Sequence, residues 1–413
     1  AHVHALGDSC PKAKGIIHLG MTSQDVVCNA DNIVLMDAIA LIRMKVARVV
    51  LSLSGQANLR KSVPALGFTH YQPAQPVTVG RRCALWAYDL SLCHDRMRQT
   101  ATESPFDSLR GLRGATGTQA SFLALLSSNS GRVDLLERTW IAKLYGHSKT
   151  QEDDGGVTHQ LVGQTYPRVI DTFILADLAS AASVLHKIAT DIRLLCNRKE
   201  LDEPFEDKQI GSSAMPYKRN PMRCERICGL ARFVMNLVGN AYDTAATQWL
   251  ERTLDDSSNR RLSLPEAFLA LDGALDLMHN VASGLVVHEA TVRKNLMAEL
   301  PFMATENLLM ACVKAGGDRQ GYHEHIRAHA QAAGLRVKQE GQENDLLDRL
   351  KADPHFHTPA LKQELDWNGL MDPMRYIGRS VEQTERFIKE VVEPLREQYG
   401  DAIAGLETSG PKV

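Results

Sequence analysis

The sequence predicts an all-α protein: a bundle of long antiparallel helices followed by a smaller helical domain, with the bundle extended by assembly into an oligomer. Two observations predict this fold. Apolar residues recur at alternating steps of four and three over long stretches, and alternating polar and β-branched runs are scarce. The chain has 413 residues, 44% of them hydrophobic, so it can bury a large core. Because amphipathic helices need partners for their apolar faces, a bundle is the simplest arrangement.

Four long helices carry this prediction. The first starts near Asp31 and presents one apolar stripe over residues 35–53, the second does so over 178–195 and the third over 264–278. Residues 223–250 predict a fourth. We expect the bundle to occupy residues 23–287 and the shorter helices of a C-terminal domain to occupy 288–413.

Segments rich in Gly, Pro, Ser and Thr separate these helices and are predicted to be loops. Loops carry function more often than helix interiors do, so the candidate site is sought there. The acidic run 151–156 has the composition of a solvated surface insertion and is given no role. The predicted loops are residues 64–80, 110–121, 147–167, 203–221 and 251–261.

Composition excludes several classes of protein. A net charge of −2 gives no general attraction to nucleic acid, so a bound nucleotide would need a local cluster of cations. No uninterrupted apolar run reaches membrane-spanning length and no signal peptide is visible, which predicts a cytoplasmic protein without a membrane partner. The eight cysteines are scattered and fit reduced core residues. Cys224 and Cys228 could share a helix face, but no further zinc ligands are evident nearby, so no metal site is predicted.

The most informative run is Gly-Ser-Ser-Ala-Met-Pro-Tyr-Lys-Arg-Asn-Pro at 211–221. Its glycine, hydroxyls and prolines predict an irregular loop that leads into a helix. The loop could be a mobile lid that brings a hydroxyl and Lys218 onto an anionic substrate. An ordinary proline-bounded linker explains the same residues equally well.

Three further runs have two readings each. His70, in a polar loop flanked by prolines, is placed for proton transfer, although this context alone does not decide its role. Thr22 and Ser23 precede a long helix and could bind an anion or simply cap that helix. The three arginines in 251–261 suit a phosphate, and a surface ion-pair network is the alternative.

The run 211–221 resembles the signature loop of the superfamily that contains fumarase, aspartase and argininosuccinate lyase. Other runs are similar to the adenylosuccinate lyase family of the animal type; these are 218–223, 69–75, 163–166, 251–261 and 301–307. Within this superfamily the resemblance implies the all-α bundle of a homotetramer. It also implies a carbon–nitrogen lyase without a cofactor that acts in purine biosynthesis. Its small-molecule substrates would be adenylosuccinate, cleaved to AMP and fumarate, and succinylaminoimidazole carboxamide ribotide, cleaved to AICAR and fumarate.

The resemblance also implies roles for individual residues. Ser212 is the general base, with its alkoxide stabilised by N–H donors or by Lys218, and His70 is the general acid. Glu225 orients this histidine across a subunit boundary, because each active site draws on several chains. The implied substrate contacts are Thr22, Ser23, Thr69, Gln164, Asn220, Arg226, Arg252, Ser257 and Arg261.

Two points qualify this assignment. The family has an N-terminal domain, and the chain opens at Ala1 just after the run that this domain would contribute, so we expect an upstream segment and interpret residues 1–22 as its remnant. Two alternatives are weighed beside the adenylosuccinate lyase assignment. One is another lyase of the argininosuccinate lyase or fumarase type, and the other is a catalytically silent structural homologue.

Overall fold

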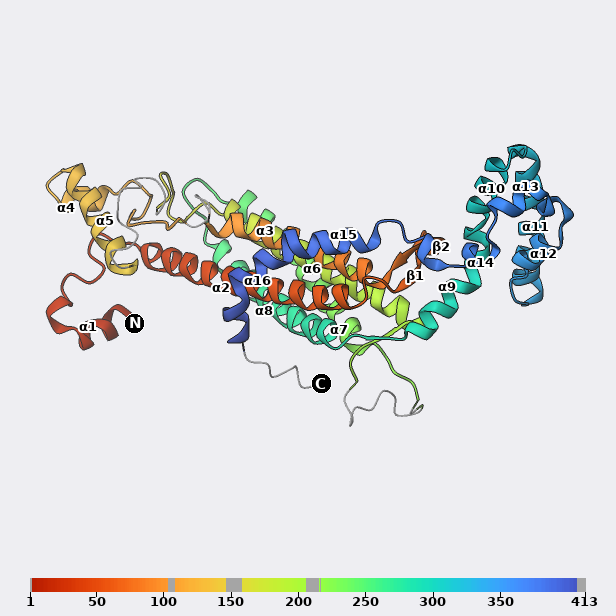
Figure 1. Cartoon of the computed structure of the whole chain (residues 1–413). Coiled ribbons are helices and arrows are strands. Elements are labelled where there is room, and N and C mark those ends of the chain that lie inside the picture. Colours follow the sequence, from red (N-terminus) through yellow and green to blue (C-terminus); the bar gives the residue numbers. More distant parts are fainter. Residues whose placement is uncertain (1, 103–107, 146–157, 206–214, 216, 407–413) are drawn as a thin grey trace.

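The computed structural model describes residues 2–102, 108–145, 158–205, 215 and 217–406. It confirms the predicted all-α fold, in which five long helices run side by side (Figure 1). These are α2 (Ser23–Leu59), α3 (Val79–Thr102), α6 (Val169–Asn197), α7 (Met222–Ala246) and α8 (Asp255–Ser283). Helix α6 packs against α3, α7 and α8, and α2 packs against α3 and α8.

The predicted apolar stripes form the core of the bundle. Residues from all three stripes are at most 2% exposed; examples are Ile42, Leu53, Leu185, Ile192 and Leu275. Because the helices are amphipathic over many turns, burying these stripes against one another provides most of their stability.

Two helices begin at residues other than those predicted. Helix α2 begins at Ser23 rather than near Asp31, since the backbone N–H of Thr22 donates to the Asp25 carboxylate at 2.7 Å and closes the first turn. Helix α8 begins at Asp255, inside the segment predicted to be a loop up to residue 261. Asp255 and Asp256 occupy its first turn, where carboxylates are favoured by the helix dipole.

The predicted loop 64–80 is instead a β-hairpin. Strand β1 (Pro64–Thr69) pairs antiparallel with β2 (Gln72–Thr78), with an irregular register between Leu66 and Phe68. The prolines of β2 obscured this strand in the sequence because proline cannot donate a ladder hydrogen bond; here the sheet has only two strands, so each has a free edge.

The C-terminal region contains a second hydrophobic core of its own, which includes Leu308, Cys312, Leu346, Phe356 and Leu361. The chain then returns to the bundle, where α15 packs against α3 and α16 packs against α2 (Figure 1). The elements of this region are α9 (Glu289–Met303), α10 (Thr305–Lys314), α11 (Arg319–Glu340), α12 (Leu346–Ala352), η3 (Pro354–His357), α13 (Pro359–Glu364), α14 (Trp367–Leu370), η4 (Pro373–Arg375), α15 (Ser380–Phe387), η5 (Ile388–Val392) and α16 (Glu393–Ala404).

Short elements complete the described chain. Helices α4 and α5 lie at one end of the bundle, and the hairpin lies toward the other (Figure 1). The short elements are α1 (His2–Ser9), η1 (Pro11–Ala13), α4 (Ala120–Leu125), α5 (Ser130–Tyr145), β3 (Leu201–Asp202) and β4 (Val286–Val287).

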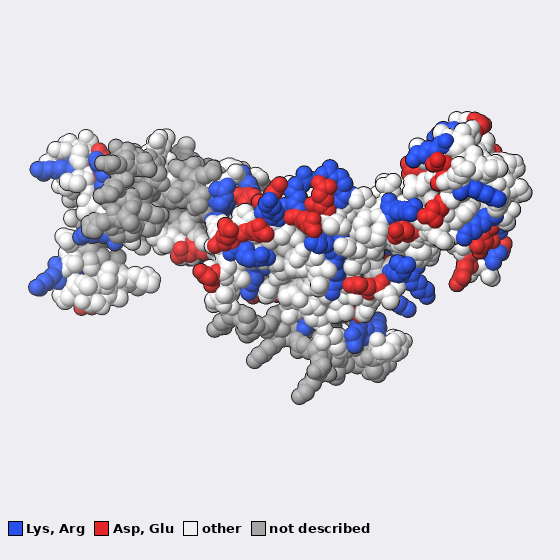
Figure 2. Space-filling model, in the orientation of Figure 1, with Lys and Arg blue, Asp and Glu red and all other residues white. Residues whose placement is uncertain are grey.

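Two helical stretches, α6 and residues 289–314, are long and apolar enough by composition to cross a membrane. The apolar residues of α6 are part of the bundle core, which accounts for the apolar character of this helix. On the face in Figure 2, acidic and basic side chains are interspersed along the bundle and the C-terminal region. This distribution agrees with the small net charge of the whole chain.

Candidate active site

A cavity of about 500 Å³ lies between α2 and α8, at the end of the bundle where both helices begin. One part of its wall is apolar, with Val34, Leu264 and Phe268. The rest of the wall is strongly basic. It contains Arg168, Arg252, Arg260 and Arg261, together with Gln24, Asp31 and Ser257. We call this region the arginine cavity.

Buried carboxylates hold three of these four arginines in place. Asp256 accepts from Arg168 at 2.7 Å and from Arg252 at 3.3 Å, and its side chain is completely buried. Arg260 contacts Asp171 at 2.6 Å and Asp31 at 3.2 Å. Because each arginine already has an anionic partner, its guanidinium is fixed in position before any ligand arrives.

Arg261 is different from the other three arginines. It is exposed at the cavity and makes no ion pair or hydrogen bond with the part of the chain that the structure describes. Its charge is therefore available to an anionic ligand. Phosphate is a suitable anion for a free guanidinium.

Tyr166 lies beneath Arg260 and links it to the core. The phenol donates to Asp171 at 2.6 Å and also contacts the Arg260 guanidinium. Burial raises the pKa of Tyr166 well above its ordinary value, so the phenol keeps its proton and remains a donor. Sequence reasoning missed this network, since Arg168 and Asp171 lie outside every run singled out in the sequence and Asp256, although within 251–261, is given no role there.

Gln164 is brought beside Arg252 by a close approach of two backbones. The side-chain oxygen of Gln164 accepts from Arg252 at 2.9 Å. The backbone N–H of Gln164 donates to the backbone carbonyl of Glu251 at 3.1 Å. A Cβ on the preceding Gly163 would lie 2.6 Å from that same carbonyl oxygen, so only glycine allows this contact.

Thr22 and Ser23 stand at the start of α2, next to the Gln24 that lines the cavity. The buried Asp25 ties this helix end to the neighbouring loop. It accepts from the N–H groups of Arg113 and Gly114, at 2.7 and 3.1 Å, and pairs with the fully buried Arg110. The beginning of α2 is therefore rigidly placed relative to the cavity.

Thr69 and His70 lie elsewhere, at the end of strand β1 and in the turn of the β-hairpin that follows it. His70 and Tyr71 form a two-residue turn with φ of 52° and 57°, both in the left-handed region that Asn and Gly usually occupy. Each such residue costs roughly 1–2 kcal/mol. The His70 side chain is exposed and has no hydrogen-bond partner among the described residues. Strain of this kind is concentrated at functional sites.

The hairpin meets another of the runs on which the resemblance rests. Pro73, Gln75 and Pro76 of β2 line a cavity of about 620 Å³ together with Met303, Thr305, Glu306 and Asn307 from the run 301–307. The runs 69–75 and 301–307, more than two hundred residues apart in the sequence, thus line the same cavity.

Lys218, Asn220, Glu225 and Arg226 lie at or just before the beginning of α7. Glu203 caps this helix, since its carboxylate accepts from the N–H groups of Arg223 and Cys224, at 3.1 and 2.6 Å. The side chains of Lys218, Glu225 and Arg226 are exposed, and Glu225 forms a distant ion pair with Arg193, at 3.9 Å.

Ser212 and most of its loop lie outside the described residues. So does the acidic run 151–156.

The candidate residues therefore form separate groups. Gln164, Arg252, Ser257 and Arg261 gather at the end where α2 and α8 begin, with Thr22 and Ser23 beside them. Thr69 and His70 follow the far end of α2, whose 37 residues span about 55 Å. One chain therefore does not bring its arginine cavity and its His70 together.

Known proteins match this chain over nearly its whole length. A family model for lyases matches residues 3–154 and 157–236, and a model for the adenylosuccinate lyase C-terminus matches 301–387. The adenylosuccinate lyase of Schizosaccharomyces pombe is 49% identical over 96% of this chain and 79% of its own length. That of Saccharomyces cerevisiae is 47% identical over 97% and 81%. The chain belongs to the adenylosuccinate lyase family.

Relatives from animals are also similar. Adenylosuccinate lyase of Schistosoma mansoni is 43% identical over 98% of this chain and 81% of its own length. As a member of the adenylosuccinate lyase family, the protein is an enzyme that acts as a lyase, and the alternative of a fumarase or argininosuccinate lyase is not favoured.

Solved structures agree on the fold. The 3-carboxy-cis,cis-muconate lactonizing enzyme from Pseudomonas putida superposes with a TM-score of 0.76 at 24% identity, over 95% of this chain and 81% of its own. A fumarate lyase from Mesorhizobium sp. BNC1 has the same TM-score and identity, over 94% and 81%. The long-helix bundle of this chain is thus shared with a fumarate lyase and with a lactonizing enzyme.

Proposed function

We propose that this adenylosuccinate lyase removes fumarate from adenylosuccinate, and from succinylaminoimidazole carboxamide ribotide, by anti elimination. The observation that carries the proposal is a basic cavity with one uncommitted arginine, built from the same residues that resemble the family's nucleotide contacts. Arg261 and Ser257 would hold the phosphate, with Arg252 and Arg226 on the nucleotide. Thr22, Ser23, Thr69, Gln164, Lys218 and Asn220 would hold the succinyl carboxylates.

The chemistry needs one base and one acid on opposite faces of the C–N bond. Ser212, as an alkoxide stabilised by Lys218, would take the proton from the succinyl carbon beside a carboxylate. The electron pair of the carbanion then forms the C=C bond of fumarate as the C–N bond breaks, and the electron pair of the C–N bond leaves with the nitrogen. His70 would give that nitrogen a proton, with Glu225 orienting the imidazole.

We further propose that the active site is completed only in a homotetramer. The long separation between the arginine cavity and His70 supports this, because no single chain can close the site. Apolar side chains on the outside of α2 and α8 offer a surface for another copy: Val26, Val34, Leu262 and Leu269 are each more than half exposed. Antiparallel packing of two such bundles would bring the cavity of one chain toward the hairpin of another.

Two further expectations remain proposals. We propose that the protein works in the cytoplasm, which is supported by all eight cysteines being free thiols. We also propose the division into residues 1–22, 23–287 and 288–413, supported by the separate C-terminal core.

The reaction is tested by ultraviolet absorbance, following adenylosuccinate in the presence of purified full chain. We expect stoichiometric AMP and fumarate. If no turnover occurs when the chain is folded and assembled, the elimination proposal is wrong and the silent homologue is favoured.

The sharing of sites is tested by mixing two inactive variants, Ser212→Ala and His70→Ala, under conditions that allow subunits to exchange. If a site draws these residues from different chains, some mixed sites contain both intact groups, and turnover should rise well above the sum of the two variants. The control is each variant subjected to the same treatment alone. A mixture that stays as inactive as its components would overturn the shared site while leaving the reaction itself in place.

A further inference from the structure

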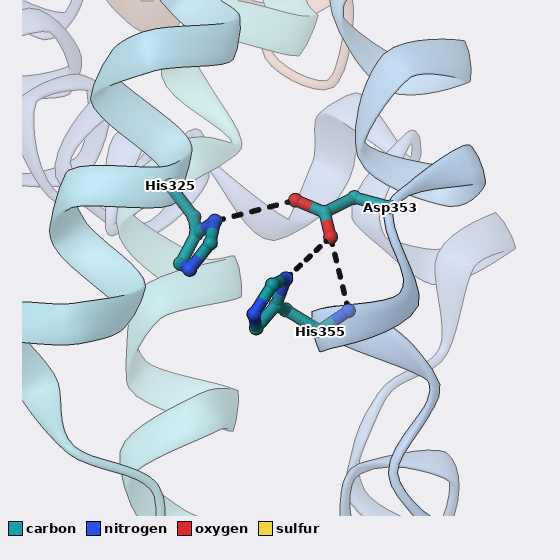
Figure 3. A group of neighbouring side chains, drawn as sticks. All are labelled: His325, Asp353 and His355. Carbon is teal, nitrogen blue, oxygen red and sulfur yellow. Dashed lines mark hydrogen bonds and ion pairs between the residues drawn. The ribbon is translucent and has the colours of Figure 1, made fainter.

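His325, Asp353 and His355 form a cluster in the C-terminal region, away from the candidate active-site residues (Figure 3). A third histidine, His329, also contacts Asp353. His325 and His329 project from α11, four residues apart and so on the same face of the helix. Asp353 and His355 come from the segment that ends α12 and begins η3. The cluster thus joins two elements of the C-terminal core.

All three imidazoles point a nitrogen at the same carboxylate. His329 Nε2 lies 2.8 Å from Asp353 Oδ2, His325 Nδ1 lies 3.5 Å from that oxygen, and His355 Nδ1 lies 2.8 Å from Oδ1. The rings of His325 and His355 are stacked, with their centroids 3.8 Å apart. The ligand atoms of His325, Asp353 and His355 all lie within 4.8 Å of one another.

The architecture of the chain explains the aspartate but not the histidines. Asp353 is the N-cap of η3, where its Oδ1 accepts from the His355 N–H at 3.0 Å. That role needs one acceptor atom and no imidazole. Three histidines converging on a carboxylate that is only 7% exposed are therefore left without a structural reason.

Their chemistry matches a late first-row divalent metal ion. Imidazole nitrogen together with a carboxylate oxygen suits Zn²⁺. Ligands of one tetrahedral ion lie roughly 3.3–3.5 Å apart, as follows from metal–ligand bonds of about 2.0–2.1 Å. The cluster would therefore close around the ion by side-chain adjustment of about 1 Å. His325 and His355 are partly exposed, which leaves a path for the ion.

We propose that His325, Asp353 and His355 bind one Zn²⁺ ion, or a similar late transition-metal dication. Water occupies the fourth position. His329 donates to the aspartate and holds it toward the ion, as carboxylate and histidine partners do around many metal sites. The ion ties α11 to η3 and so stabilises the C-terminal core. This proposal is independent of the elimination reaction.

Isothermal titration of ZnCl₂ into the full, tag-free chain, previously treated with a chelator, tests the site. We expect one ion per chain at this site. His355→Gln should weaken binding by about tenfold or more, and His325→Ala together with His355→Gln should abolish it. The matched control is His323→Ala, an exposed histidine on the same helix outside the cluster.

Other exposed side chains, such as those of His2, His4 and Cys10, could also bind Zn²⁺. The His323→Ala control keeps these groups, so any Zn²⁺ bound by them appears equally in both proteins. The proposal is overturned if the double variant binds Zn²⁺ with the affinity and stoichiometry of His323→Ala.

A second measurement does not depend on how the double variant folds. In the unmodified chain, saturating Zn²⁺ should raise the melting temperature relative to chelator, because an ion that binds only the folded state stabilises it. The single variant His355→Gln should lose most of this rise because it lacks one ligand, and it should still fold because the replaced side chain is 61% exposed. An equal rise in His355→Gln and in the control would place the ion elsewhere and reject this site. Neither measurement uses turnover.

Discussion

The two ends of the bundle are built in different ways. At the end where α2 and α8 begin, cationic side chains are buried and fixed by carboxylates, as in the pairs of Asp256 with Arg168 and of Asp171 with Arg260. At the hairpin end, His70 is exposed on a strained turn without a partner among the described residues. The comparison indicates that the arginine cavity is preorganised within one chain. His70, which we propose to be the general acid, has no such support and depends on what covers the hairpin.

The largest expected effect lies at the hairpin end. His70→Ala should lower kcat by about 10²–10⁴-fold, the usual contribution of a general acid, because the leaving nitrogen loses its proton donor. Folding should be unchanged, since the side chain is exposed. Steady-state kinetics and circular dichroism check this, with Tyr71→Phe as the control in the same turn. Near-normal turnover in His70→Ala would remove this residue from the mechanism.

The next effect tests the preorganised end. Asp256→Asn leaves Arg168 and Arg252 buried without their anion, and breaking such a pair typically costs about 3–5 kcal/mol of unfolding free energy. Urea denaturation measures this loss. The control, Glu382→Gln, breaks an exposed pair with Arg379 and should leave stability nearly unchanged, because water screens that pair. If both variants lose the same unfolding free energy, Asp256 does not hold Arg168 and Arg252 in place as described.

Arg261 separates binding from stability at the same end. Arg261→Ala should reduce kcat/KM by roughly ten- to a hundredfold, as expected for one lost charged hydrogen bond of about 1.5–3 kcal/mol. Most of the change should appear in KM, and the melting temperature should stay constant because Arg261 supports no described contact. Arg327→Ala, on the surface of α11, is the matched control. A fall in stability without a change in KM would show that Arg261 is structural.

The smallest effect concerns backbone strain near the hairpin end. Lys199 follows α6 with φ of 60°, and its N–H and that of Glu200 close the helix end on the carbonyls of Cys196 and Leu195. Lys199→Gly should raise the unfolding free energy by about 0.5–1 kcal/mol, because glycine adopts this conformation without a Cβ clash. Thermal unfolding of Lys199→Gly is compared with that of Lys199→Ala, which should not raise the unfolding free energy. A loss of stability in the glycine variant would show that no strain is stored at this position.

Sequence reasoning succeeded where the signal was local and repeated. The stripes over 35–53, 178–195 and 264–278 are buried, since a helix with one apolar face must cover that face. It was wrong about the hairpin, because a His-Tyr turn and two prolines in β2 lack the usual markers of a two-residue β-turn. It also placed Ser257, Arg260 and Arg261 in a loop, although they occupy the first turns of α8.

By itself, the sequence determined the helical class of the protein, its family and the residue types at its candidate site, because these depend on periodicity and on contiguous runs. Only the tertiary structure decided which of those residues meet. It gathered Gln164 and Arg252 at one end of a long helix, left His70 beyond the other end, and assembled His325, Asp353 and His355 from two elements. Whether such residues lie close together depends on helix length and packing direction, and the spacing of residues within a single motif determines neither.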